Sequence, residues 1–284
     1  MEPTVALAVI TLFAAVVNGA LGYGFSSITV PVALLFLTNR ALNPALVIIE
    51  VALNAYVLWA NRAALPRVRR RVLPVVMGLG PGVLAGTLIV AHVSPAWLKL
   101  GTYVGLLPLI LVQAAGLRRP IRSERGAGLA FGTGIGVLYS VTTISGPPLA
   151  VALNNQGFSK QDFRAALGFI RLAESGLTAV AYAAMGLYTF DSLALVPQIL
   201  PSVAIGLPIG AFVIHHVRAE TFRRVCMSFD AWVVSFGISI LLRDLHLVES
   251  AAAFSVMAAV VVIDIWLLYR FFSEAVPAPA SHAA

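Results

Sequence analysis

The sequence predicts an all-α polytopic membrane protein with two inverted-topology repeats, each a broken or re-entrant first helix plus three spans, and one extra C-terminal span. The first observation is composition: 60% of the 284 residues are hydrophobic and 11% are charged, whereas a soluble domain has about 25% charged residues. The second is a series of apolar stretches long enough to cross a bilayer. The third is a pattern of glycine, proline and glutamate that occurs twice. This composition excludes the soluble, disordered and fibrous classes. The disulfide-scaffold class is excluded because a single cysteine forms no internal disulfide.

The apolar stretches follow one another along the whole chain. Seven have about the length of one transmembrane helix, and two are longer. The first lacks a basic start, so a cleaved signal peptide is not expected. The stretches expected to enter the membrane are 3–37, 43–60, 72–91, 94–116, 128–153, 163–182, 193–215, 222–242 and 250–272.

The two long stretches are each interrupted near the middle. A straight helix over 3–37 would measure about 52 Å, against a hydrocarbon core of about 30 Å. Residues 18–24 (Asn-Gly-Ala-Leu-Gly-Tyr-Gly) interrupt the first stretch, and residues 142–148 (Thr-Thr-Ile-Ser-Gly-Pro-Pro) interrupt the second. Glycine tolerates non-helical backbone and proline breaks the helical hydrogen-bond ladder. Each long stretch therefore predicts two half-helices that meet inside the membrane, where protein or a water-filled cavity satisfies the irregular backbone.

An internal repeat accounts for the two breaks. The Gly-xxx-Gly pair that begins at Gly82 returns at Gly206, an offset of 124 residues, and the same offset places Glu50 on Glu174. The glycine-rich break returns at an offset of 117. Both Gly-xxx-Gly pairs suit internal helix packing, with a homodimer as the alternative. The expected segments are a first membrane repeat 1–116, a basic cytoplasmic loop 117–127, a second membrane repeat 128–245, an extra C-terminal span 246–272 and a disordered tail 273–284.

The basic loops orient the chain, whose net charge is +7. Arginines crowd the expected loops 62–71 and 118–125, which are therefore expected in the cytoplasm; no nucleic-acid partner is implied. If 128–153 is a hairpin, Phe158 emerges on that same side and the two halves have opposite orientation. Inverted repeats are typical of transporters whose site lies between the halves. Counting membrane crossings from these cytoplasmic loops places the N-terminus outside, in the periplasm, and the C-terminus in the cytoplasm.

Three ionisable residues lie near the middle of expected spans, where charge is costly and commonly functional. Glu50 lies in one span, and Arg171 and Glu174 lie three residues apart in another. Arg171 is expected to bind an anion, and the two glutamates to couple transport to protons. Glu50 is expected to be the better proton carrier, because its own helix has no basic neighbour. The alternative is a buried ion pair of Arg171 with Glu174, joined by Glu50, that only fixes packing.

The remaining ionisable residues are expected to be structural or solvated. Asp230 and Asp264 have less polar sequence neighbours, and histidines lie at span ends. No spacing makes a zinc or di-iron site, and no cofactor is expected.

The two breaks are the other candidates for substrate binding. A half-helix N-terminus offers unpaired N–H groups and the positive end of the helix dipole, which together attract anions. Hydroxyls beside such an end suit an oxyanion. For any one hydroxyl taken alone, a helix cap or tight helix packing is the favoured explanation, whereas the convergence of two breaks favours binding by the group. The residues expected to bind substrate are Asn18, Gly22, Gly24, Ser26, Ser27, Thr142, Thr143, Ser145, Gly146 and Arg171.

The glycine-rich motifs resemble those of a known family. The sequence Gly-Ala-Leu-Gly-Tyr-Gly at 19–24, followed by Pro31, resembles the first helix of the TauE/SafE sulfite exporter family, also called the toluene sulfonate uptake permease family. The second copy extends from Gly132 to Pro148. The resemblance covers nearly the whole chain and implies transport of sulfur-containing or small organic anions across the bacterial inner membrane.

The expected function is a secondary transporter, an exporter of sulfite, a sulfonate or a carboxylate, working by alternating access with proton coupling. The sequence has no nucleotide-binding loop, so ATP does not drive it directly. An intramembrane enzyme is one alternative, although no Ser–His or Cys–His set lies within the spans. A non-transporting membrane assembly or sensory subunit is the other. Membrane lipid is expected around the helices.

Overall fold

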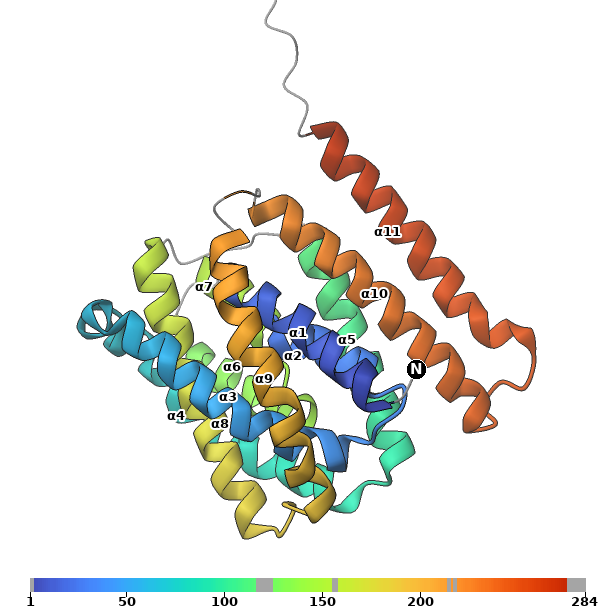
Figure 1. Ribbon diagram of the computed structural model, residues 1–284, viewed down its shortest axis with the longest axis horizontal. Coiled ribbons are helices and arrows are strands. Elements are labelled where there is room, and N and C mark those ends of the chain that lie inside the picture. The colour runs from blue at the N-terminus through green and yellow to red at the C-terminus, as the bar shows by residue number, and fades with distance from the viewer. Residues whose placement is uncertain (1–2, 116–124, 155–157, 214–215, 217–218, 275–284) are drawn as a thin grey trace, which may run out of the picture.

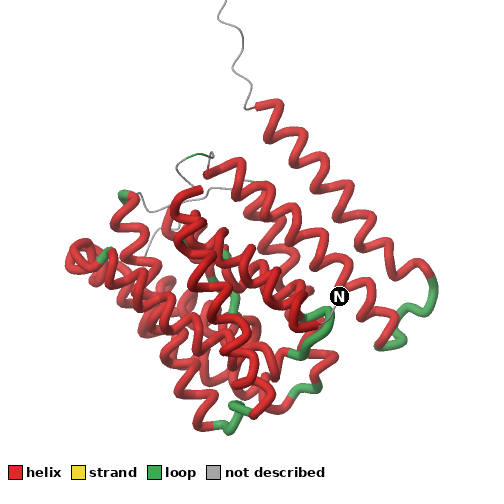
Figure 2. Tube along the Cα trace, in the orientation of Figure 1, coloured by secondary structure: helices red, strands yellow, loops and turns green. Residues whose placement is uncertain are grey.

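The computed structural model describes residues 3–115, 125–154, 158–213, 216 and 219–274. Helices make up most of this part of the chain, and no strand occurs in it (Figure 2). In chain order the elements are α1 (Pro3–Leu21), α2 (Phe25–Ala33), α3 (Asn39–Ala60), the 3-10 helix η1 (Arg62–Ala64), α4 (Leu65–His92), α5 (Pro95–Ala114), α6 (Arg125–Thr142), α7 (Gly146–Asn154), α8 (Lys160–Ala184), α9 (Phe190–Val213), α10 (Ala219–Asp244), the 3-10 helix η2 (Ala251–Phe254) and α11 (Ser255–Glu274).

The helices confirm the all-α polytopic membrane class. Among the described residues, seven helical spans are long and apolar enough to cross a membrane, and they contain α1, α3, α4, α5, α9, α10 and α11. The stretch expected as a span at 163–182 lies in α8, which is not among the seven and carries Arg171 and Glu174 near its middle. α8 nevertheless packs along α3 and α4 (Figure 1).

One basic segment differs from expectation. Residues 67–71 were expected in a loop, but they form the beginning of α4. Pro66 stands in the first turn of α4, where its missing N–H costs no hydrogen bond, and arginine is a good helix former. The arginines therefore extend the helix beyond its apolar part.

Both predicted helix breaks are present. The first separates α1 from α2 at Gly22 and Gly24, whose φ angles are 83° and 110°. The second separates α6 from α7, and there Thr143 adopts a φ of 56°. Glycine adopts positive φ freely, whereas a residue with a Cβ does so at a cost. The first break thus follows directly from its glycines, and the second requires support from its surroundings.

The second broken helix is a hairpin that returns to the end where it began. The beginning of α6, at Ala127, and the end of α7, at Leu153, line one cavity together with Arg71. The Arg71 guanidinium also lies 4.3 Å from the ring centroid of Phe158. Phe158 thus lies beside the basic beginning of α4. That Phe158 emerges on the cytoplasmic side of the membrane stays a prediction, and Arg122 lies outside the described residues.

Pairing between the two halves is reciprocal. The first helix of each half packs along a helix of the other, α1 on α9 and α6 on α4, while α3 packs on α8. The weaker contacts of α2 with α10 and of α7 with α5 follow the same exchange. Each half thus has a broken helix and three further helices, with α11 left over. The opposite orientation of the halves in the membrane stays a prediction.

The Gly-xxx-Gly pairs make these exchanged contacts close. A Cβ on Gly210 would lie 1.9 Å from the carbonyl oxygen of Val16 on α1, and one on Gly82 would lie 2.1 Å from that of Thr133 on α6. Such distances are far below a van der Waals contact, so only glycine fits. Internal packing is the role of these glycines, as expected.

α11 is held to the bundle by a buried ion pair. Arg224 on α10 donates to Asp264 Oδ1 at 2.8 Å, and Trp232 Nε1 donates to Oδ2 at 3.1 Å. The structural role expected for Asp264 is thus observed, whereas Asp230 is buried with its Oδ1 unpartnered among the described residues. α11 ends at Glu274, two residues into the segment expected as a disordered tail, and residues 275–284 lie outside the described part.

Candidate functional site

The two helix breaks meet in the interior of the bundle. Tyr23 lies in the first break and Gly146 begins α7 after the second. A Cβ on Gly146 would lie 3.2 Å from the Cβ of Tyr23. Two segments more than a hundred residues apart in sequence are therefore in contact, and the N-terminal ends of α2 and α7 both begin at this junction.

A charged cluster lies beside the junction, and we call Glu50, Arg171 and Glu174 the central charge cluster. All three side chains are almost fully buried, at 0%, 4% and 0% exposure. Ser26, from the first turn of α2, donates to Glu50 Oε1 at 2.6 Å. Ser145, directly before α7, donates to Glu174 Oε1. Each broken helix thus gives one serine hydroxyl to the glutamate of the helix that follows it.

The two glutamates differ in how well they are paired. Arg171 Nη2 donates to Glu50 Oε1 at 2.8 Å, and Tyr139 OH donates to Oε2 at 2.7 Å. With Ser26, Glu50 accepts three hydrogen bonds and both its oxygens are satisfied. Glu174 Oε1 lies 3.8 Å from Arg171 Nε, and its buried Oε2 has no partner among the described residues.

This arrangement bears on the ranking of the two glutamates. Glu50 was expected to be the better proton carrier because its own helix offers no cation, but the guanidinium of Arg171 reaches it from α8. Glu50 thus has a close cation and three hydrogen-bond donors, whereas Glu174 keeps one oxygen without a partner among the described residues. Which glutamate carries a proton stays a prediction, and these contacts favour Glu174. With all three groups ionised, the cluster carries two negative charges and one positive charge, a net charge of −1.

Arg171 is consequently not a free cation. The ion-pair alternative describes its observed contacts, with Glu50 as the closer partner rather than Glu174. Its Nε is buried and unpartnered among the described residues. This unpartnered donor of the guanidinium lies 3.8 Å from Glu174 Oε1.

Side chains from other helices support the second break. Helix ends leave carbonyl groups without partners. Tyr182 OH donates to the carbonyl oxygen of Ser140, and Asn43 Nδ2 donates to that of Val141 at 2.7 Å. Thr142 Oγ1 donates to the carbonyl of Leu138 at 2.7 Å and accepts from the Ile144 N–H at 3.0 Å. The Thr142 hydroxyl therefore caps the end of α6, which agrees with the alternative that a single hydroxyl at a break only caps a helix.

The other expected substrate-binding residues are distributed around the junction. Thr143 is buried, and its hydroxyl donates to the Thr142 carbonyl at 2.7 Å. Ser27 is buried in the first turn of α2, and Gly24 is the N-cap of that helix. Asn18 is 4% exposed, and its Oδ1 has no partner among the described residues.

Asn18 and Gly22 line the Asn18 cleft, a cavity of about 430 Å³ between α1, α3, α8 and α9 that also includes Leu53, Asn61, Arg164 and Leu207. A second cavity, of about 270 Å³, is lined by Val93, Trp97 and Thr142. Asn61 precedes η1 and α4, whereas Val93 follows α4. The two cavities therefore lie toward opposite ends of α4, and each reaches one of the two breaks.

Sequence reasoning missed two groups that complete the site. Tyr139 was not considered, although a tyrosine inside an apolar helix normally needs a partner for its hydroxyl. Asn54, one turn beyond Glu50, donates from Nδ2 to the Arg171 carbonyl at 3.3 Å. Polar side chains on the face of Glu50 were the signal that could have identified it.

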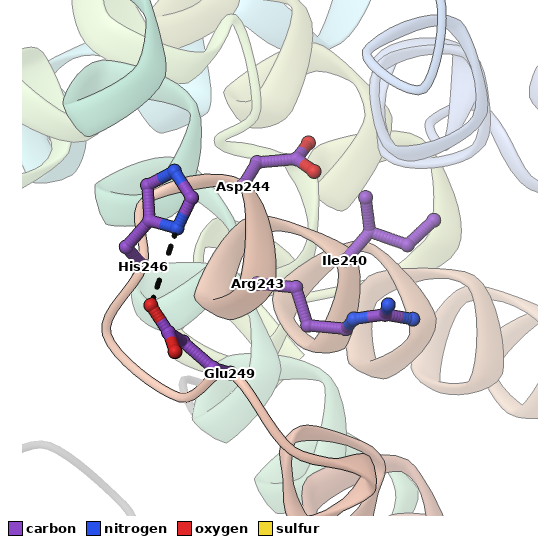
Figure 3. Close-up of a pocket in the computed structure, with 5 residues that line it drawn as sticks. All are labelled: Ile240, Arg243, Asp244, His246 and Glu249. Carbon is purple, nitrogen blue, oxygen red and sulfur yellow. Dashed lines mark ion pairs between the residues drawn. The ribbon is translucent and has the colours of Figure 1, made fainter.

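A larger cavity, of about 770 Å³, lies at the end of α10 and in the following loop (Figure 3). None of the described residues that line it belongs to either break. Its lining includes Arg243 and Asp244. His246 Nδ1 lies 3.6 Å from Glu249 Oε1, with the side chains 80% and 81% exposed. A solvated histidine is what was expected at this span end. In the described residues no group of three or more His, Cys, Asp or Glu side chains could hold a metal ion.

Comparison with protein families gives one result. The family described as "Sulfite exporter TauE/SafE" matches residues 7–237. The match includes both breaks and the central charge cluster, and it ends before α11. No curated protein and no solved structure matches the chain.

Proposed function

The chain belongs to the TauE/SafE sulfite exporter family, and on this premise we propose that it is a proton-coupled secondary transporter of a small anion. The anion is sulfite, a sulfonate or a carboxylate, and the membrane is the bacterial inner membrane. The family is one of multi-pass membrane transporters, so we propose no enzymatic activity. The observation that carries the proposal is the junction of two half-helix N-termini with the buried central charge cluster.

Electrostatics link the anion to a proton. An anion about 5 Å from an uncompensated carboxylate is repelled by about 3 kcal/mol at an effective dielectric constant of about 20. This energy corresponds to about a hundredfold in affinity. Protonation of one glutamate brings the net charge of the cluster from −1 to zero and removes the repulsion. Proton and anion therefore bind together.

Glu174 is the group proposed to take the proton. Its Oε2 is unpartnered among the described residues, so a proton there breaks no existing hydrogen bond. Glu50, which accepts three hydrogen bonds, is the fixed counter-ion of Arg171 in this proposal. Protonation of Glu174 leaves Arg171 Nε, the Ser145 hydroxyl and the ends of the half-helices to receive the anion.

Alternating access is proposed to proceed by rocking of the two halves. The cavities at opposite ends of α4 reach different breaks, which supports two routes to one central site. We further propose that the basic ends of α4 and α6 face the cytoplasm and the N-terminus faces the periplasm, in accordance with the positive-inside rule. The sum of the anion and proton gradients sets the direction, so export occurs when anion production inside the cell makes the outward anion gradient larger than the inward proton gradient.

Flux in proteoliposomes tests the function. Purified protein is screened with sulfite, propanesulfonate and acetate at several pH values. For wild type, the apparent KM is expected to fall as the pH falls, because protonated Glu174 admits the anion. Glu174→Gln mimics the protonated state and should make KM independent of pH, while Glu249→Gln, an exposed control, should behave as wild type. Absence of flux for every anion would reject transport, and unchanged pH dependence in Glu174→Gln would reject the coupling.

A further inference from the structure

Resting on the proposed function, we propose that the Asn18 cleft is a substrate-binding site selective for an organic anion with a short apolar body and a terminal polar group. Such a ligand is a small alkyl sulfonate or carboxylate that carries a hydroxyl. A bare inorganic oxyanion such as sulfite would bind there more weakly.

The cleft has the volume and position for this role. Its volume of about 430 Å³ falls in the range of small-molecule sites. Gly22 and Asn18 place one part of it at the first helix break. Arg164, in the first part of α8, is exposed to solvent at another part. A molecule bound in the cleft therefore connects the surface with the break that bears Ser26.

Arg164 supplies the charge for the anionic head. It is the one charged residue that lines the cleft, and no carboxylate in the described part of the chain pairs with it. The nearest acidic residue along α8, Asp162, lies 3.0 Å from Arg67 Nη2 instead. A planar guanidinium binds the oxygens of a sulfonate or carboxylate in a bidentate manner.

Apolar side chains make up most of the wall. Leu53 and Val57 of α3 line the cleft together with Leu207 and Pro208 of α9. Each methylene that such a wall removes from water increases affinity about fourfold. Sulfite has no methylene and gains nothing from these contacts, so the wall selects for an alkyl chain.

Asn18 provides the second polar contact. It is 4% exposed, and its Oδ1 has no partner among the described residues. Buried polar atoms are normally hydrogen-bonded. A hydroxyl at the far end of the ligand donates to this oxygen and satisfies it. The apolar wall between Arg164 and Asn18 then accommodates the carbon chain.

A comparison of transport of three anions tests the selectivity. Initial flux into proteoliposomes is measured for sulfite, propanesulfonate and hydroxypropanesulfonate. The expected order of increasing KM is hydroxypropanesulfonate, propanesulfonate, sulfite. Asn18→Ala should remove the difference between the two sulfonates. Sulfite with the lowest KM would overturn the proposal, even if transport itself is established.

Paired variants test the site. Arg164→Gln should raise KM about tenfold for both sulfonates with little change in maximal flux, whereas Arg69→Gln, an exposed arginine outside the cleft, should not. Ala211→Leu narrows the cleft and should impair sulfonate transport more than sulfite transport, with Ala258→Leu on α11 as the matched control. Equal KM values in Arg164→Gln and Arg69→Gln would overturn the proposal that the anion binds in the Asn18 cleft.

Direct binding separates this inference from the proposed function. Calorimetric titration of detergent-solubilised protein with hydroxypropanesulfonate needs no transport. Binding in wild type that is weakened in Arg164→Gln, together with no flux, would uphold the cleft and reject the transporter. Flux without binding at Arg164 would reject the cleft alone. An equal loss of binding in Arg164→Gln and in the control Arg69→Gln would mean that the effect is not specific to Arg164, and it would overturn the assignment of the head group to Arg164.

Discussion

Replacing Glu50 by glutamine should strongly destabilise the protein, because the carboxylate is the closest counter-ion of a buried arginine. The substituted amide can still accept from Ser26 and Arg171 through its oxygen, so the shape of the contact is retained. The negative charge 2.8 Å from Arg171 Nη2 is lost, and the guanidinium keeps only Glu174 at 3.8 Å.

The magnitude follows from the burial of the pair. Removing one partner of a buried ion pair costs about 3–5 kcal/mol. The remaining carboxylate of Glu174 compensates part of the charge, so we expect the lower end, about 3 kcal/mol, for Glu50→Gln. Glu174→Gln removes a longer contact and a carboxylate with one unpartnered oxygen, so we expect a loss below about 1 kcal/mol.

Equilibrium unfolding in mixed detergent micelles, followed by helical circular dichroism, measures both variants. Glu249→Gln is the control, because its exposed pair with His246 contributes little. The expected order of unfolding free energy is wild type and Glu249→Gln together, then Glu174→Gln, then Glu50→Gln. Equal stability of the two buried variants would refute the assignment of Glu50 as the fixed counter-ion.

Three further outcomes are expected. Arg171→Lys keeps the charge but loses the planar fork, so the protein should fold while its KM for the anion rises, as flux in liposomes would detect. Gly210→Leu forces α9 away from Val16 and should prevent folding, seen as aggregation in gel filtration, whereas Gly105→Leu, where a Cβ meets nothing within 4 Å, should elute as wild type. Phe158→Cys in a Cys226→Ala background should be labelled only from the cytoplasm, and periplasmic labelling in intact cells would reject the proposed orientation.

Local sequence features predicted the all-α membrane class and both helix breaks. Gly22, Gly24 and the two prolines after Ser145 identify both helix breaks, because each acts on the backbone where it stands. The spacing of Arg171 and Glu174 on one helix likewise predicts that they are neighbours. These inferences need no knowledge of which helices pack together.

The partners of the site residues depend on packing between distant helices. Glu50 and Arg171 are separated by 121 residues, and nothing on α3 itself indicates that a cation faces it. The Tyr139 contact with Glu50 similarly spans 89 residues. Reasoning from each helix alone therefore predicted that Glu50 is isolated and that Glu174 is the partner of Arg171. The packing of α3 against α8 instead makes Glu50 the closer partner.

The exchange of helices between halves has a consequence for synthesis. α1 leaves the ribosome well before α9, the helix whose glycines fit against it, and α4 precedes α6. Until those partners are made, the glycines of α1 and α4 lack the helices that they contact in the folded protein. These two interfaces are complete only after the second half has been synthesised. We therefore expect separately produced halves to recombine, and either half alone to be degraded.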